Sequence, residues 1–380
     1  MITIGLLACL LLTASASGAA DPQWRPVGAP GFSAGPADSL SLSVSKSIPY
    51  VAYVYEDLYG FNKLTVMKYN GSRWATVGPA GWSVPNAGGP VLFVDNGTPY
   101  LAYEDYGQGG KASVLKFDGT QWVAVGPPGF STGAVNFLSL VVADGTPYLA
   151  YSESQNDYSA VVMKYDGSRW VRVGLHPLSG ASAYFLSLAV DNGTPYLAYS
   201  DGKHLFKTTV WKYNGGRWAT VGRRDFSSGA AYFLSLAVDR GVPYLAFNGQ
   251  HHGPEEGIRD SRTSSAAAGS VSLSTRMIGG STASIVVYNG VPFVTYGDGG
   301  ASNKASVLKY NGTSWETVGP AGLSAGAAEH PSLFLYQGTP YLAYCDQANS
   351  HEAAVLKYEG ANWLNVGRPG ISAGEALSPF

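Results

Sequence analysis

The segment Gly97-Thr-Pro-Tyr-Leu-Ala-Tyr103 decides the fold, because close variants of it occur seven times along the chain. A short apolar unit of this kind cannot bury its own faces, so copies of it stack against one another. The chain is therefore predicted to be one array of a roughly 48-residue repeat. The proline of the segment marks the copies, at Pro49, Pro99, Pro147, Pro195, Pro243, Pro292 and Pro340.

Each repeat reads as four short strands. In the third copy the runs 139–142, 148–151, 159–165 and 170–173 are rich in β-branched and aromatic residues and are separated by Gly, Pro or Asp, which is the pattern of strands and turns. Pairs such as Asp166-Gly167 suit a tight hairpin, because both central residues of its turn need positive φ. Seven such units predict an all-β fold, a seven-bladed β-propeller of four-stranded antiparallel blades.

The two ends of the chain and the fifth repeat depart from this pattern. Residues 1–20 hold a short apolar run followed by small residues, which predicts a secretory signal peptide ahead of a single propeller domain at 21–380. Leu6-Leu-Ala-Cys9 also resembles a bacterial lipobox, the alternative for this segment. The fifth repeat is degenerate, since the expected turn and Trp are replaced by 248–257 and a Ser/Ala/Gly-rich stretch at 263–275.

Closure of the ring can be predicted from one repeated strand. Both Trp24–Gly28 and Trp363–Gly367 carry the Trp-x-x-Val-Gly strand, and the seventh blade has one place for it. We expect the amino-terminal copy to pair with blade seven, because this removes an open sheet edge and ties the ends of the chain together.

Composition limits the partners and the chemistry. Lys and Arg number 24 against 26 Asp and Glu, so the basic surplus typical of nucleic-acid binding is lacking. No zinc-protease helix or phosphate loop motif occurs, and His176, His204, His330 and His351 lie in variable loops without an evident common partner. His251, His252, Glu255 and Glu256 contain metal-ligand types, but a solvated insertion explains them better, and neither metal nor cofactor is expected.

Two sets of residues are predicted to bind a ligand. Aromatic pairs precede the innermost strand in three neighbouring blades, where they suit stacking on a sugar ring. An acid follows the Pro-Tyr strand in most blades, where it either joins a ring of ligand-binding carboxylates or caps a turn. The two sets are Phe137, Tyr184, Phe185, Tyr232 and Phe233, and Asp105, Asp201, Asp298 and Asp346.

The Tyr165-Asp-Gly-Ser-Arg-Trp170 succession loosely resembles the outer strands of kelch-type propellers, although Ala-Tyr stands where kelch blades carry Gly-Gly. The full repeat is similar to secreted repeat propellers of unassigned function, and propeller lectins are the nearest analogy in shape. The sequence thus favours a secreted, lectin-like binding module whose partner meets the variable loops. Its alternatives are an extracellular protein partner, or a lyase or hydrolase with carboxylates at the mouth of the channel.

Overall fold

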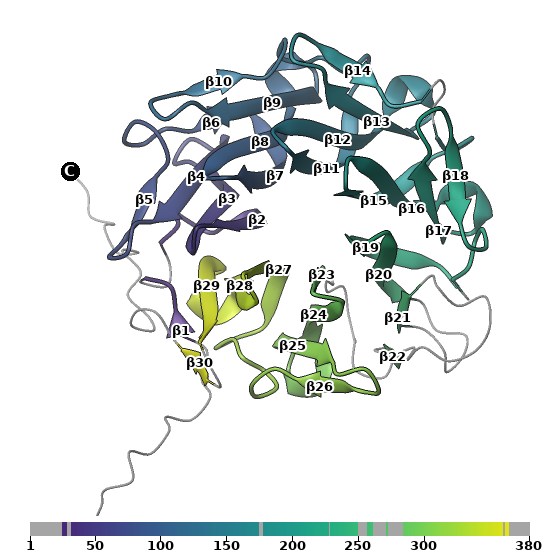
Figure 1. Ribbon diagram of the computed structural model, residues 1–380. Helices are drawn as coiled ribbons and strands as arrows, with labels where there is room; N and C mark the ends of the chain where they lie inside the picture. Colours follow the sequence, from purple (N-terminus) through teal and green to yellow (C-terminus); the bar gives the residue numbers. More distant parts are fainter. Residues whose placement is uncertain are drawn as a thin grey trace, which may run out of the picture.

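The computed structural model describes residues 25–28, 32–174, 178–227, 229–249, 257–260, 271–272, 284–359 and 362–364. Strands in these ranges form a ring of sheets around a central axis, with each sheet running outward like a blade (Figure 1). The protein is thus a β-propeller with repeated, antiparallel blades. The proposed signal peptide and the His251–Glu256 segment lie outside the described residues, as does His176.

The sequence period sets the order of strands within a blade. In blade three, β11 (Val135–Ala143), β12 (Thr146–Glu153), β13 (Ser159–Tyr165) and β14 (Trp170–Arg172) pair in chain order from the axis outward. The same order recurs in β7 (Ala87–Asp95), β8 (Thr98–Asp105), β9 (Lys111–Phe117) and β10 (Trp122–Ala124), and in β15 (Ala183–Asp191), β16 (Thr194–Asp201), β17 (Lys207–Tyr213) and β18 (Trp218–Val221).

Blade one contains β2 (Asp38–Ser45), β3 (Ile48–Glu56), β4 (Asn62–Tyr69) and β5 (Trp74–Thr76), with β6 (Val84–Pro85) also on β4. Blade six contains β23 (Ser284–Tyr288), β24 (Val291–Asp298), β25 (Lys304–Tyr310) and β26 (Trp315–Thr317). The fifth sheet keeps long inner strands, β19 (Ala231–Asp239) and β20 (Val242–Gly249), but β21 (Gly257–Asp260) and β22 (Val271–Ser272) are short. Of the seven described sheets six are therefore regular blades, so the predicted number of seven blades is wrong. The irregular sheet is the fifth, the repeat expected to be degenerate.

The core lies between neighbouring blades. Trp170 of blade three stacks on Phe130, which follows blade two, with ring centroids 4.5 Å apart, and its indole donates to the Val125 carbonyl at 2.7 Å. Near the axis, serine hydroxyls of one inner strand accept amide hydrogen bonds from the next, as Ser139 does from Leu188 at 2.9 Å. Phe130 therefore fills the space between blades two and three.

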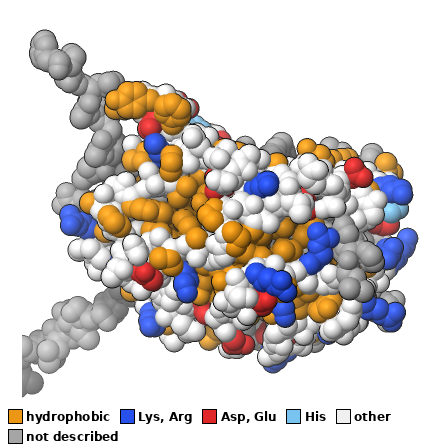
Figure 2. All heavy atoms as spheres, turned by 90° about the horizontal axis from the view of Figure 1, so that it is seen from above, with side chains coloured by type: hydrophobic (Ala, Val, Ile, Leu, Met, Phe, Trp, Pro, Cys, Tyr) orange, Lys and Arg blue, Asp and Glu red, His pale blue; other side chains and the backbone are white. Residues whose placement is uncertain are grey.

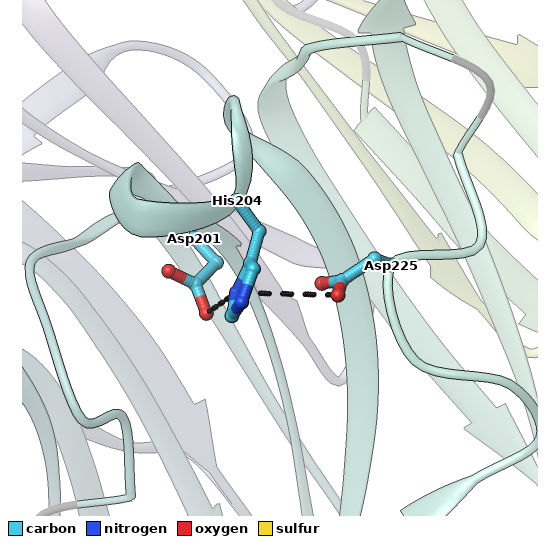
Figure 3. Close-up of side chains that lie close together, drawn as sticks. All are labelled: Asp201, His204 and Asp225. Carbon is cyan, nitrogen blue, oxygen red and sulfur yellow. Dashed lines mark hydrogen bonds and ion pairs between the residues drawn. The ribbon is translucent and has the colours of Figure 1, made fainter.

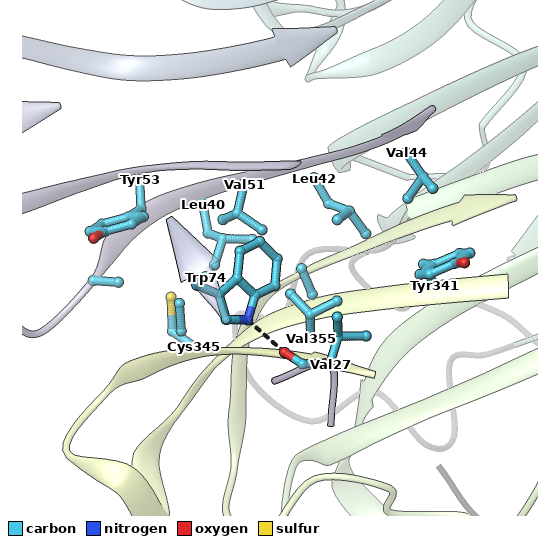
Figure 4. Packing of buried hydrophobic residues seen from close by; sticks show 13 residues of the cluster. Val27, Leu40, Leu42, Val44, Val51, Tyr53, Trp74, Tyr341, Cys345 and Val355 are labelled. Atoms are coloured by element: carbon cyan, nitrogen blue, oxygen red, sulfur yellow. Dashed lines mark hydrogen bonds between the residues drawn. The ribbon is translucent and has the colours of Figure 1, made fainter. Parts of the chain in front are cut away.

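Both ends of the chain complete blade seven, which contains β27 (Ala328–Tyr336), β28 (Thr339–Asp346) and β29 (Glu352–Glu359). Strand β1 (Arg25–Pro26) pairs with Lys357 and Leu356 of β29, and β30 (Asn362–Leu364) pairs with the same strand from Lys357 onward. The amino-terminal copy closes the ring, as expected (Figure 4). The premise that only one copy fits was wrong, because β29 is long enough for the two to share its edge.

The surface carries charges of both signs. Seen edge-on, blue and red side chains are scattered among apolar ones, and neither sign forms a field on this side of the disc (Figure 2). The described part of the chain holds no helix with the length and apolar character needed to cross a bilayer.

Candidate functional site

Two backbone positions adopt left-handed conformation in most of the described blades, at the rim of the variable-loop face. This is the face bearing the connections between second and third strands. The first is a β-bulge in the inner strand, at Ser39, Gly89, Phe137, Phe185, Phe233 and His330, with φ between 50° and 54°. The second precedes the third strand, at Gly110, Tyr158, Phe206, Asn303 and His351, with φ between 56° and 74°.

Blade two shows that the fold needs no side chain at either position, because it carries Gly89 and Gly110 there. Bulky residues in left-handed conformation cost on the order of 1 kcal/mol each and persist where the surroundings hold them. The side chains that other blades carry at these positions are therefore not required for the ring to form.

Aromatic side chains occupy the rim in blades three to five and form one connected group, the aromatic arc. Phe185 is central to it, with ring centroids 5.1 Å from Phe137, 5.0 Å from Phe233 and 5.7 Å from Tyr232. Phe206 lies 5.1 Å from Tyr184 and 6.0 Å from Tyr232. The structure thus brings together all five predicted aromatics and adds Phe206. All members are partly exposed.

Ionisable side chains occupy the rim where blade seven meets blade one, and we call them the His–acid arc: Asp38, Glu329, His330 and His351. The Nδ1 atom of His351 lies 3.1 Å from Glu329 Oε2, and His330 Nε2 lies 3.7 Å from Asp38 Oδ1. A hydrogen bond from Gln347, followed by the two imidazoles, lowers the pKa of Glu329.

The sequence does not show that each of these two histidines faces an acid, His351 facing Glu329 and His330 facing Asp38. His330 and His351 are far apart in the chain but stand at the two rim positions of one blade, a relation that becomes visible only once the bulge is located.

The predicted acids sit one to a blade, and three of them cap the turn that follows. Asp201, Asp298 and Asp346 each accept a hydrogen bond from the amide two residues on, at 2.9, 2.9 and 3.0 Å. Asp105 makes no such bond and accepts from the Ser113 hydroxyl at 2.9 Å instead. Asp298 and Asp346 are only 2% and 1% exposed. The geometry therefore shows turn capping for three of the acids, and ligand binding by any of the four stays a prediction.

Comparison with known proteins gives neither a family nor an activity. No family model matches the chain, and no curated protein does. Among solved structures, a Trypanosoma rangeli sialidase in complex with sialic acid aligns with TM-score 0.48 at 11% identity, covering 88% of this chain and 57% of that one. A mutant of that sialidase with trans-sialidase activity aligns with TM-score 0.48 at 10% identity, covering 85% and 54%.

A protein of unknown function from Dyadobacter fermentans aligns with TM-score 0.46 at 11% identity, covering 89% of this chain and 98% of that one. The chain spans just over half the length of the sialidases. The chain is similar to these proteins, but TM-scores and sequence identities this low give no information on what it binds.

Proposed function

We propose that the chain is a secreted β-propeller that binds a glycan across the aromatic arc. The observation that carries this proposal is the arc itself, six aromatic rings in mutual contact on the face with the variable loops, three of them at bulge positions where another blade has glycine. Ring faces stack on the C–H faces of sugars, and the Tyr184 and Tyr232 hydroxyls can bond sugar hydroxyls.

Several features support a glycan over a protein partner of the same surface. The arc is continuous over three blades but bears none of the charged side chains of the rim, and the chain has nearly balanced charge. Export is part of the proposal because the apolar run at 2–13, with small residues after it, is typical of a signal peptide. An extracellular protein that inserts an apolar loop is the competing partner.

A glycan-array screen of the secreted protein tests the proposal. The Phe185→Gly variant should no longer bind the glycans that the unchanged protein binds. Its fold should be preserved, since blade two carries glycine at this position. Ser39→Gly is the matched control, because it introduces glycine at the same position of blade one, which contributes no residue to the aromatic arc, and glycan binding should persist. The proposal would be contradicted if the protein bound no glycan, or if the Phe185→Gly variant bound glycans as the unchanged protein does.

A second candidate function, cleavage of the bound chain, is favoured by the His–acid arc. Glu329 and His351 are in hydrogen-bond contact and partly exposed, an arrangement that can pass a proton to or from a substrate. Mass spectrometry of array hits after incubation decides between the two functions. New, shorter products that disappear with His351→Gln support cleavage, and intact glycans support binding alone.

A further inference from the structure

Outside both arcs, blade four holds three further ionisable side chains against one another (Figure 3). Asp201 ends β16, His204 ends the 3-10 turn η3 (Gly202–His204), and Asp225 lies in the connection from β18 to β19. His204 Nδ1 lies 2.8 Å from Asp201 Oδ2 and 3.9 Å from Asp225 Oδ2, and the three candidate ligand atoms all lie within 4.8 Å of one another.

The repeat shows that this cluster is a departure of one blade from the common plan. At the His204 position the other described 3-10 turns end in Gln108, Asn156, Ala301 and Asn349. At the Asp225 position blades one, two and six carry Gly81, Gly129 and Gly322, all with positive φ. Blade four alone among these carries an imidazole at one position and a carboxylate at the other.

These two positions face each other wherever the comparison can be made. A Cβ atom on Gly129 would lie 2.9 Å from the Cβ of Gln108, and one on Gly322 would lie 3.0 Å from the Cβ of Ala301. The fold therefore brings the two substituted positions together, and it places them beside Asp201, which the repeat already supplies as a turn cap. Three candidate ligands therefore converge because of two substitutions.

The other oxygen of each carboxylate is held by a hydrogen bond. Asp201 Oδ1 accepts from the Lys203 amide at 2.9 Å, and Asp225 Oδ1 accepts from the Thr209 hydroxyl at 3.5 Å. The Oδ2 atoms of both acids consequently face His204. Carboxylates that bind a metal are commonly held by hydrogen bonds in this way.

We propose that Asp201, His204 and Asp225 bind a Zn²⁺ ion, with water as the fourth ligand. One imidazole nitrogen with two carboxylate oxygens is a donor set that suits zinc, whereas calcium needs more oxygens. Tetrahedral bonds of about 2.0 to 2.1 Å separate neighbouring ligand atoms by about 3.3 Å. The observed 2.8 and 3.9 Å lie on either side of this separation, and all three ligand atoms lie within 4.8 Å of one another, so the site would form by movements of these side chains alone.

The side chains are accessible, with 51%, 15% and 30% exposure for His204, Asp201 and Asp225. A zinc ion could therefore reach these side chains from solvent, and a water molecule could occupy its fourth coordination position. The proposal stands apart from glycan binding, since it rests on no residue of either arc.

Isothermal titration of the full-length secreted protein, stripped with a chelator, tests the site with Zn²⁺ alone. We expect one equivalent to bind, Ca²⁺ not to bind at the same concentrations, and Co²⁺ to give the visible bands of a tetrahedral ion. Asp225→Gly and His204→Asn install residues that other blades carry, so both should fold, and each should weaken zinc binding at least about tenfold.

The control is the double variant His251→Ala, His252→Ala, which removes two histidines that are neighbours in the sequence and are not part of the proposed site. It should bind zinc as the unchanged protein does. Zinc binding that survives both Asp225→Gly and His204→Asn, or that disappears in the control, overturns the assignment. So does the absence of binding, which would leave the cluster as an ion pair between protonated His204 and its two acids.

Discussion

The indole nitrogen of Trp74 donates a hydrogen bond to the main-chain carbonyl of Val27, 47 residues earlier in the chain. Trp122, Trp170 and Trp218 make the same bond to Val77, Val125 and Val173, each in the blade before its own. Val27 therefore takes the place of these valines in blade seven, and its amide donates to Val355 as that of Val77 does to Val66. The amino-terminal strand is thus part of the contact between the last blade and the first.

Removing residues 21–30 should lower the melting temperature and promote oligomers. The deletion takes away Val27 and bares the outer edge of β29, and an unpaired strand edge recruits other chains. Removal of 368–380 should have little effect. Differential scanning calorimetry and size-exclusion chromatography measure both results. A silent amino-terminal deletion, with unfolding on loss of 363–366, would assign closure to the carboxy-terminal copy.

Trp170→Ala should lower the free energy of unfolding by roughly 3 to 5 kcal/mol, the usual range for truncating a buried aromatic. Trp170 is 8% exposed, and its loss removes both the stacking on Phe130 and the bond to Val125. Urea denaturation provides the measurement, with Tyr59→Ala as the control because Tyr59 is 84% exposed. A loss no greater than that of the control would undo the packing argument.

Tyr184→Ala and Tyr232→Ala should each weaken binding of an identified glycan by about 1 to 3 kcal/mol while leaving the fold intact. Each ring contacts Phe206 and one phenylalanine of the arc, so its loss opens the stacking surface. Titration calorimetry measures the affinity. Tyr288→Ala is the control, because this partly exposed tyrosine ends β23 on the opposite face. Equal losses on both faces would refute the placement of the site.

The His204 imidazole should titrate above its ordinary range, because a hydrogen bond to Asp201 and the charges of Asp201 and Asp225 raise its pKa. The folded pKa exceeds the unfolded one, so the ion pair stabilises the fold fully below the ordinary pKa of histidine. That stabilisation disappears as pH rises through the folded value. NMR titration of the zinc-free protein measures this, and Asp225→Gly should shift the pKa downward. A His204 pKa at or below that of a model peptide would contradict the cluster.

The sequence could predict the ring, the strand order and the closing strand, because all three follow from turns and apolar runs repeated at one period. It also located five members of the aromatic arc, since residues just ahead of an inner strand must lie near the axis. It could not predict that Phe206 joins them, that His351 meets Glu329, or that His204 meets Asp225. Those contacts depend on which loop folds over which, and no local pattern encodes that.

The left-handed rim positions bear on how such an array could diversify after its repeats were duplicated. The backbone conformation is the same in six blades, whether the residue is Gly89, Ser39, Phe185 or His330. Substitutions at these positions consequently change the side chains offered to a ligand without changing how the copies assemble. A set of identical modules can in this way acquire an asymmetric surface, aromatic on one side and bearing histidines and acids on the other, through single substitutions that each leave the ring able to form.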